Sequence, residues 1–536
     1  MRFLKIASSN VPNYGWPIVV CCYTITLLAI PLASLPCSYS NPSIDEIQFV
    51  DLAGNDHHDN VKRSLDTKAD HTHPLKIHLH YDIASIGKLD VEKQIYINST
   101  LLPAATEFWE QALYVRQKRF PIRLPRKCIT NGYYVKRNDT IPICFKDCQK
   151  VNFCGAVEVP KDHLLKCYYC TAKSNNSCDN TSYEDGEGVE GADFILYVSA
   201  ARTDKCKGVD TIAYAAHCAQ EAELDRPIAG HVNICPDALS THSHDQEILL
   251  STVKHEILHA LGFSAGLYAF WRDDSGKPRT KRNRHGKPLS LNREKGYYDW
   301  DDSTIKTITR NDWWTAEGIT SHTIHVMVTE RVKSEVQAHF GCNSLEGAEL
   351  ENQGGDGTAI THWEKRVFEN EAMTGTHTQD PVYSRITLAL LEDTGWYKAN
   401  YEAAEDLHWG YQLGCNFTKQ SCGQWISEKM ANRESVAPFC VDIKHDGKKN
   451  LAVTRCTAQR DSLALCNLVP YTKEIPLEYR NFQHLNGLRA NALKYYGGSV
   501  ELSDFCPYNQ EFEWKDKFNA EGNKIRRDSR LVKNNH

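Results

Sequence analysis

Residues 246–264 read QEILLSTVKHEILHALGFS, and their apolar residues recur at the spacing of an amphipathic helix. We expect Gly262 to end this helix. His255 and His259 are four residues apart, so on a helix both imidazoles project from one face and can bind the same Zn²⁺. Glu256 adjoins the first histidine, where its carboxylate can take a proton from water activated by a metal. The stretch therefore predicts metal-dependent hydrolysis.

Two histidines do not complete such a site. In a chain with 23 histidines the pattern can also arise by chance, on a surface or core helix. The apolar face of the predicted helix supports the metal interpretation; it is formed by Ile248, Leu249, Val253, Ile257 and Leu261. A catalytic zinc needs a third protein ligand and an open position. In compact zinc-protease motifs a third histidine follows the second by six residues, but Ala265 stands there.

The third ligand must therefore lie elsewhere in the chain, and the residues alone leave several candidates open. His362 lies between a glycine-rich turn and an apparent helix, where a loop can carry it to the metal. The competing candidates are His242, His244, His322, His325 and His339.

Two separated stretches carry a resemblance to a known family. HEILHALGFS (255–264) and GTAITHWEKRVFENEAMTG (357–375) resemble the leishmanolysin family of metzincins, and within it most closely the animal leishmanolysin-like peptidases, or invadolysins. DRPIAGHVNICP (225–236) and ELENQGGDGT (349–358) match as well. The resemblance implies one Zn²⁺ per chain held by His255, His259 and His362. It also implies Glu256 as the general base and Met373 as the turn methionine beneath the metal.

The expected fold class is α+β. A metzincin-type catalytic region, with a twisted mixed sheet against the zinc helix, is followed by a disulfide-rich C-terminal module. We expect strands at 77–83, 192–200 and 230–236, and helices at 101–115 and 383–400. Residues 211–227 are interpreted as helix or loop, and the polar, basic stretch 272–320 as an exposed solvated insertion. Strand 230–236 is the candidate sheet edge for binding an extended peptide.

Composition limits the class of protein. The chain has 536 residues, of which 41% are hydrophobic, a globular balance with room for several domains. Lys+Arg 62 against Asp+Glu 68 gives a net charge of −6, which argues against an electrostatic nucleic-acid binder. The 20 cysteines favour disulfides and a secretory route.

The N-terminal part agrees with that route. An apolar run at 18–34, preceded by Arg2 and Lys5, predicts a signal peptide or, alternatively, an uncleaved signal anchor. Five sequons are glycosylation candidates: Asn98, Asn138, Asn175, Asn180 and Asn416. The predicted divisions are a signal segment (1–37), a propeptide-like polar leader (38–74), a zinc-helix region (75–265), an insertion with the third ligand and methionine turn (266–400), and the C-terminal module (401–536).

The cysteines give three further expectations. Seven between Cys128 and Cys178 predict a disulfide-stapled region, in preference to a zinc or redox role for Cys167-x-x-Cys170. If Cys21, Cys22 and Cys37 leave with the leader, 20 − 3 = 17 remain, so one thiol is unpaired or bonded to another chain. In family precursors a propeptide cysteine is thought to occupy the zinc. Cys37 is close to the signal and no cysteine lies between Cys37 and Cys128, so we expect no such switch here.

These observations predict a zinc metalloendopeptidase of the secretory pathway, extracellular or at the cell surface, that hydrolyses peptide bonds in protein or peptide substrates. No nucleic-acid partner is expected, and no membrane span unless the leader is an uncleaved anchor. The alternative is a cell-surface adhesion or interaction protein with a vestigial site. A structural zinc module would need a fourth, closing ligand.

Overall fold

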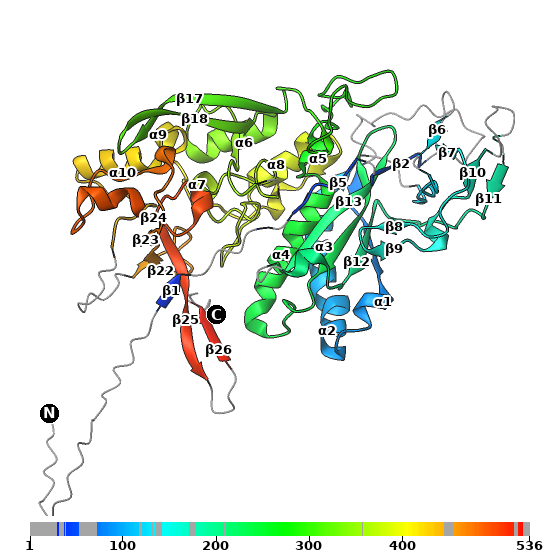
Figure 1. Ribbon diagram of the computed structural model, residues 1–536, viewed down its shortest axis with the longest axis horizontal. Helices are drawn as coiled ribbons and strands as arrows, with labels where there is room; N and C mark the ends of the chain where they lie inside the picture. Colours follow the sequence, from blue (N-terminus) through cyan, green and yellow to red (C-terminus); the bar gives the residue numbers. More distant parts are fainter. Residues whose placement is uncertain are drawn as a thin grey trace, which may run out of the picture.

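The computed structural model describes residues 29–31, 37, 39–44, 46–52, 72–116, 120–130, 132–135, 142–170, 178, 180–207, 211–355, 357–443, 454–518 and 524–528. Figure 1 shows a sheet with helices α3 and α4 in one half of the molecule, and the helices and hairpins of the C-terminal part in the other. Helices and sheets are mixed, as the predicted α+β class requires.

The first half is built on a five-stranded mixed sheet with strand order β2-β13-β14-β12-β4. Its strands are β2 (Gln48–Val50), β4 (Ile77–Tyr81), β12 (Phe194–Ser199), β13 (Ala213–Glu221) and β14 (Pro227–Ile234). β13 is antiparallel to β14, and the other neighbours are parallel. Every residue of β12 and β13 is buried, because both faces of the sheet are covered.

One face carries the predicted zinc helix, α4 (Ser243–Leu261), beside α3 (Leu102–Ala112). The indole of Trp109 donates to the carbonyl of Lys254 at 3.0 Å and joins the two helices. α4 ends at Gly262, as predicted. The chain enters α3 through α1 (Ile83–Ile86), α2 (Val91–Tyr96) and a π-helical turn, Ile97–Leu101. A small sheet then joins β3 (His73–Pro74), β5 (Leu113–Val115) and β20 (Tyr397–Ala399).

The other face is covered by the predicted disulfide-stapled region. Its strands are β6 (Tyr133–Val135), β7 (Pro142–Cys144), β8 (Phe153–Cys154), β9 (Val157–Glu158), β10 (Cys167–Tyr169) and β11 (Asn180–Ser182). Its disulfides are Cys128–Cys144, Cys148–Cys167, Cys170–Cys178 and Cys154–Cys218, the last of which reaches β13. Cys167 and Cys170 pair with different partners, which rules out a C-x-x-C metal or redox pair.

Two predictions about the sheet are wrong, one of secondary structure and one of strand position. Residues 213–221, within the stretch interpreted as helix or loop, form β13. Its alanines have little strand preference of their own, and burial between two covered faces decides the outcome. The expected edge strand, 230–236, belongs to β14, which lies between β12 and β13 in the interior of the sheet. The strand that borders the zinc helix is β13.

The stretch 272–320 is more ordered than a solvated insertion. Two successive tight turns, 272–278 and 282–288, begin with Arg272 and Arg282, and both guanidinium groups donate to the buried carboxylate of Asp225. Since these side chains are only 12% and 11% exposed, the prediction of a solvated basic loop is wrong for them. The remaining elements here are α5 (Ala265–Tyr268), β15 (Leu291–Asn292), β16 (Tyr297–Tyr298) and a long hairpin of β17 (Ile305–Thr315) and β18 (Gly318–Met327).

Helix α8 (Arg385–Asp393) is shorter than the helix predicted at 383–400, and every residue from Ile386 to Asp393 is buried. It packs against α6 (Glu330–Phe340) in the middle of the C-terminal half. The other elements are β19 (Ala348–Leu350), α7 (Lys365–Phe368), α9 (Gly414–Lys419), α10 (Cys422–Ala431), β21 (Arg455–Cys456), β22 (Leu463–Cys466), β23 (Leu468–Pro470), β24 (Tyr496–Gly498), β25 (Asn509–Phe518), β26 (Lys524–Asp528) and β1 (Ala29–Pro31), which pairs with β25.

Four more disulfides link the rest of the chain: Cys206–Cys235, Cys342–Cys415, Cys422–Cys506 and Cys440–Cys466. Among the described residues, Cys37 and the exposed Cys456 are free. Cys456 is therefore the unpaired thiol that the odd count predicted once the leader cysteines are set aside.

The described residues allow only some of the remaining N-terminal and surface predictions to be checked. Most of the expected signal and leader lies outside the described residues, as do Asn138 and Asn175. Asn98 and Asn416 are exposed and Asn180 is half-buried, so their glycosylation stays a prediction. Within the described ranges, no helix combines the length and the apolar character needed to cross a membrane.

The contact between α4 and the sheet depends on Gly230. A Cβ there would meet the Ala216 carbonyl oxygen and the Phe194 ring at 2.8 Å and Ala260 at 3.2 Å. We expect Gly230→Ala to lower the free energy of unfolding by about 1–3 kcal/mol, measured by urea denaturation, because helix and sheet must separate. Gly262→Ala is the control: its Cβ meets only the ends of Leu391 and Thr394, at 3.0 and 3.4 Å, and should cost less. Equal losses would contradict this account.

Candidate metal centre

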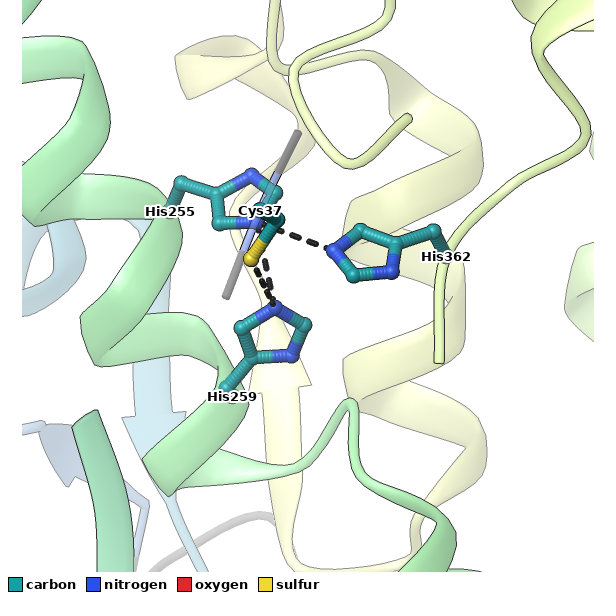
Figure 2. A group of neighbouring side chains, drawn as sticks. All are labelled: Cys37, His255, His259 and His362. Carbon is teal, nitrogen blue, oxygen red and sulfur yellow. Dashed lines mark hydrogen bonds between the residues drawn. The ribbon is translucent and has the colours of Figure 1, made fainter. Parts of the chain in front are cut away.

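Three imidazoles converge at the end of α4 nearest Gly262. His255 and His259 come from one face of the helix, and His362 from the loop between β19 and α7. The Nε2 atom of His255 lies 3.1 Å from that of His259 and 3.2 Å from that of His362. Figure 2 shows the three rings facing a common point. The other candidate ligands lie elsewhere: His322 contacts Glu478, His325 contacts Thr307, and His339 contacts the Trp409 carbonyl.

Each imidazole ring is hydrogen-bonded to a backbone carbonyl through Nδ1, the ring nitrogen that points away from the site. Nδ1 of His255 donates to the Ala372 carbonyl at 2.6 Å, that of His259 to the Phe263 carbonyl at 2.7 Å, and that of His362 to the Thr358 carbonyl at 2.9 Å. With the proton on Nδ1, each Nε2 lone pair points into the site. The three contacts therefore fix both the tautomer and the ring direction that a metal requires.

Burial keeps these rings neutral. It lowers the pKa of His255 to about 4 and of His362 to about 3, and it lowers that of His259 further. Neutral imidazoles are the form that binds zinc. Three nitrogens at about 2.0–2.1 Å from a tetrahedral zinc stand roughly 3.3 Å apart, close to the spacing observed, so the donor set fits the ion.

Glu256 lies beside these rings, 2% exposed, with its carboxylate aimed at the sheet edge. Its Oε2 accepts a hydrogen bond from the backbone N–H of Ala215, on β13, at 3.0 Å. Burial raises the pKa of this carboxyl to about 8. The glutamate thus stands between the candidate metal and the strand that borders the helix.

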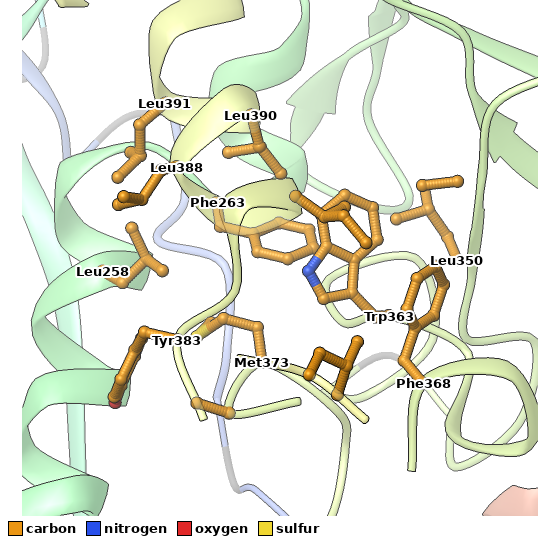
Figure 3. Close-up of a cluster of buried hydrophobic side chains, with 14 of the residues drawn as sticks. Leu258, Phe263, Leu350, Trp363, Phe368, Met373, Tyr383, Leu388, Leu390 and Leu391 are labelled. Atoms are coloured by element: carbon orange, nitrogen blue, oxygen red, sulfur yellow. The ribbon is translucent and has the colours of Figure 1, made fainter. Parts of the chain in front are cut away.

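Met373 lies in the turn that supports His255. Its side chain is fully buried, and its carbonyl accepts from the Trp363 N–H at 2.9 Å. Figure 3 shows Met373 with Leu258, Phe263 and Trp363 in a cluster of buried apolar side chains. The preceding residue supplies the Ala372 carbonyl that holds His255. The role of turn methionine that the resemblance implies for Met373 stays a prediction.

Cys37 reaches the same point from the N-terminal side. Its Sγ donates to Glu256 Oε1 at 3.4 Å and lies 3.8 Å from His259 Nε2. One ligand atom from each of Cys37, His255, His259 and His362 lies within 4.8 Å of all the others. The expectation that Cys37 lies too close to the signal to reach the site is wrong, because the few residues after it are enough to anchor it there.

Those following residues run through the cleft. The Tyr39 ring stacks on His259, with centroids 4.2 Å apart, and β2 adds to the free edge of β13. The cavity left beside Cys37 has a volume of only about 50 Å³. This segment was not predicted because Cys37 was taken as the end of the signal. Tyr39, the first aromatic residue after Cys37, was the one feature of the sequence that indicated packing of the segment against the protein.

Comparison with known proteins agrees with this geometry. The family model described as leishmanolysin matches residues 166–519. The chain belongs to the leishmanolysin family. It is therefore of the metzincin type of zinc protease, as the resemblance implied.

Several relatives are named "Leishmanolysin-like peptidase". The one from Caenorhabditis elegans is 58% identical over 502 residues, which cover 92% of this chain and 75% of the relative. The one from Drosophila melanogaster is 52% identical over 446 residues, covering 83% and 64% respectively. A mouse "Ciliated left-right organizer metallopeptidase" is 39% identical over 243 residues, covering 44% of this chain and 30% of its own.

The geometry predicts that His362 is needed for metal binding even though 103 residues (362 − 259) separate it from His259. We expect His362→Ala to lower zinc content, measured by plasma mass spectrometry on purified protein, well below one ion per chain, because two imidazoles alone bind weakly. His325→Ala, in the insertion, serves as the control and should leave zinc content unchanged. Full zinc content in the His362 variant would show that another residue is the third ligand.

Proposed function

We propose that the protein is a zinc metalloendopeptidase with His255, His259 and His362 as ligands and Glu256 as the general base. The observation that carries the proposal is the convergence of three carbonyl-anchored imidazoles, with His255 Nε2 at 3.1 Å from that of His259 and 3.2 Å from that of His362, next to a buried carboxylate. Family membership supports a metallopeptidase in general, and the site geometry supports this assignment of roles.

When bound, zinc supplies a Lewis acid that acidifies water and polarises a carbonyl group. The chain does the rest. The Ala215 N–H fixes one carboxylate oxygen of Glu256, so that the other, Oε1, faces the histidines. That oxygen takes the proton of the attacking water and then delivers it to the leaving amine.

The edge of β13 is the proposed substrate-binding strand. Its N-terminal end, Ala213 and the adjoining Ile212, lines the cavity beside Glu256, and its other end already accepts β2 as an added strand. An extended peptide can add along this edge through main-chain hydrogen bonds, which bind many sequences. Cleavage within protein chains follows from such a binding mode.

We also propose that the chain is made in a latent form. Cys37 occupies the fourth ligand direction, where water must sit in a catalytic site. With Cys37 in place the group has the four donors of a closed, structural site.

A zinc-binding module of purely structural role is disfavoured because Glu256 would then have no purpose beside the metal. Eight disulfides support folding in the secretory pathway.

Replacement of Glu256 by glutamine tests the mechanism. We expect Glu256→Gln to retain zinc and lower the rate of protein cleavage roughly 100- to 10,000-fold, because the amide cannot accept the proton. Glu247→Gln is the matched control, since Glu247 is exposed on the same helix and should not affect the rate. Unchanged cleavage by a folded, zinc-loaded Glu256 variant would disprove the assignment and favour a vestigial site.

Replacement of Cys37 tests latency. We expect Cys37→Ala to increase the proteolytic activity of the full chain several-fold, because the fourth ligand direction opens to water. Cys456→Ala removes the other free thiol, far along the sequence and exposed, and should change nothing. Cleavage of a quenched protein substrate measures both. If the Cys37 variant stays as inactive as the parent, the thiol is not what blocks the site.

A further inference from the structure

Next to the candidate metal centre, three groups that the proposed reaction does not use lie near the side-chain oxygen of Asn41: the hydroxyl of Ser264, the backbone N–H of Gly266 and the imidazole of His217 on β13. The space that Asn41 fills between them is called the pocket below. A Cβ built on Gly266 would lie 3.5 Å from Ser264 Oγ and 3.7 Å from His217 Cε1. The carbon between the two ring nitrogens of His217 therefore faces the pocket.

Asn41 of the leader occupies this pocket. Its side-chain oxygen accepts hydrogen bonds from the Ser264 hydroxyl at 3.2 Å, the Gly266 N–H at 3.1 Å and the hydroxyl of its neighbour Tyr39 at 3.1 Å. The Tyr39 and Ser264 hydroxyl oxygens also lie 2.5 Å apart, so their two protons are shared among three contacts, and one hydroxyl can donate to the other in place of donating to Asn41. Two of the three donors belong to the enzyme body and remain when the leader leaves.

His217 has no other evident task. It is completely buried, and neither ring nitrogen has a hydrogen-bond partner among the described residues. Buried polar groups are nearly always hydrogen-bonded, so an orphaned imidazole facing a pocket marks a place where a ligand can bond. The pocket also adjoins the metal: Tyr39, bonded to Asn41, stacks on His259.

We propose that Ser264, the Gly266 N–H and His217 form a substrate subsite that binds an asparagine side chain, and that Asn41 mimics this side chain in the latent chain. This inference rests on the proposed peptidase function. The carbonyl oxygen meets the same two donors that Asn41 uses. The neighbouring acceptor for a substrate amide group is His217, whose ring nitrogens Asn41 leaves without a partner and whose pKa burial lowers to about 3. With a neutral imidazole and no cation in contact, a carboxylate would be bound less well than an amide.

Cleavage of fluorogenic peptides tests whether the pocket binds an asparagine side chain of the substrate. In an otherwise constant peptide, one asparagine is moved through the positions on each side of the cleaved bond, with alanine and aspartate at the same positions for comparison. We expect kcat/KM to be about fivefold or more higher for asparagine than for alanine at one position. Ser264→Ala and His217→Ala should abolish that preference while still cleaving the alanine peptide. No preference in the parent, or a preference that survives both variants, overturns the proposal; an aspartate preference would replace the amide with a carboxylate ligand.

Hydrogen exchange on the full chain tests the pocket without catalysis. We expect Asn41→Ala to accelerate exchange of the Gly266 amide about tenfold, because that N–H loses its acceptor. Ser43→Ala, exposed two residues further along the leader, is the control and should leave it unchanged. Unchanged exchange in the Asn41 variant would mean that Asn41 does not fill the pocket. If the parent protein cleaves no protein at all, the proposed function fails, and so does the proposal that the pocket binds a substrate asparagine. The exchange result would still show whether Asn41 fills the pocket.

Discussion

The site depends on one constraint: three neutral nitrogens must be held within about 3.3 Å of one another in the interior of a protein. The carbonyls of Ala372, Phe263 and Thr358 meet that constraint, each fixing one imidazole through Nδ1. Two of these carbonyls lie next to a ligand-bearing element, whereas Ala372 lies in the methionine turn. The turn is thus part of the metal site through its backbone, and Met373 contributes the apolar packing that keeps the backbone in place.

Glu371 connects this turn to α8. Its buried carboxylate accepts hydrogen bonds from the backbone N–H groups of Met373 and Ser384 and from the Thr387 hydroxyl. Burial raises the pKa of Glu371 to about 7, and these donors oppose the rise. Trp363, the residue after His362, also donates to Thr387, at 2.9 Å. One residue of α8, Thr387, therefore contacts both sides of the candidate metal centre, in the part of the helix that is buried.

The sequence predicted the parts of the site that depend on local spacing. His255, Glu256 and His259 are set by helical periodicity alone, and the structure places them as the spacing requires. His362 could be singled out from five other histidines only by the family resemblance, because no local rule connects a loop to a helix about a hundred residues away. β13 was missed because alanine-rich strands carry little strand preference, and its burial between α4 and the stapled region exists only in the folded chain.

Cys37 was misjudged for a different reason. Distance along the chain from the signal segment says little about reach, since three residues in an extended conformation span roughly 10 Å. The backbone N–H of Cys37 bonds to the Gly375 carbonyl, and Tyr39 and Asn41 then fasten the chain on the other side of His259. The thiol is therefore held from both sides, and its approach to the histidines is imposed by the neighbouring contacts. In the proposed latent form, this segment combines a thiol beside the three histidines, an aromatic ring on one imidazole and an occupant for the adjoining pocket, and because the three lie within five residues, its removal would take all of them from the cleft together.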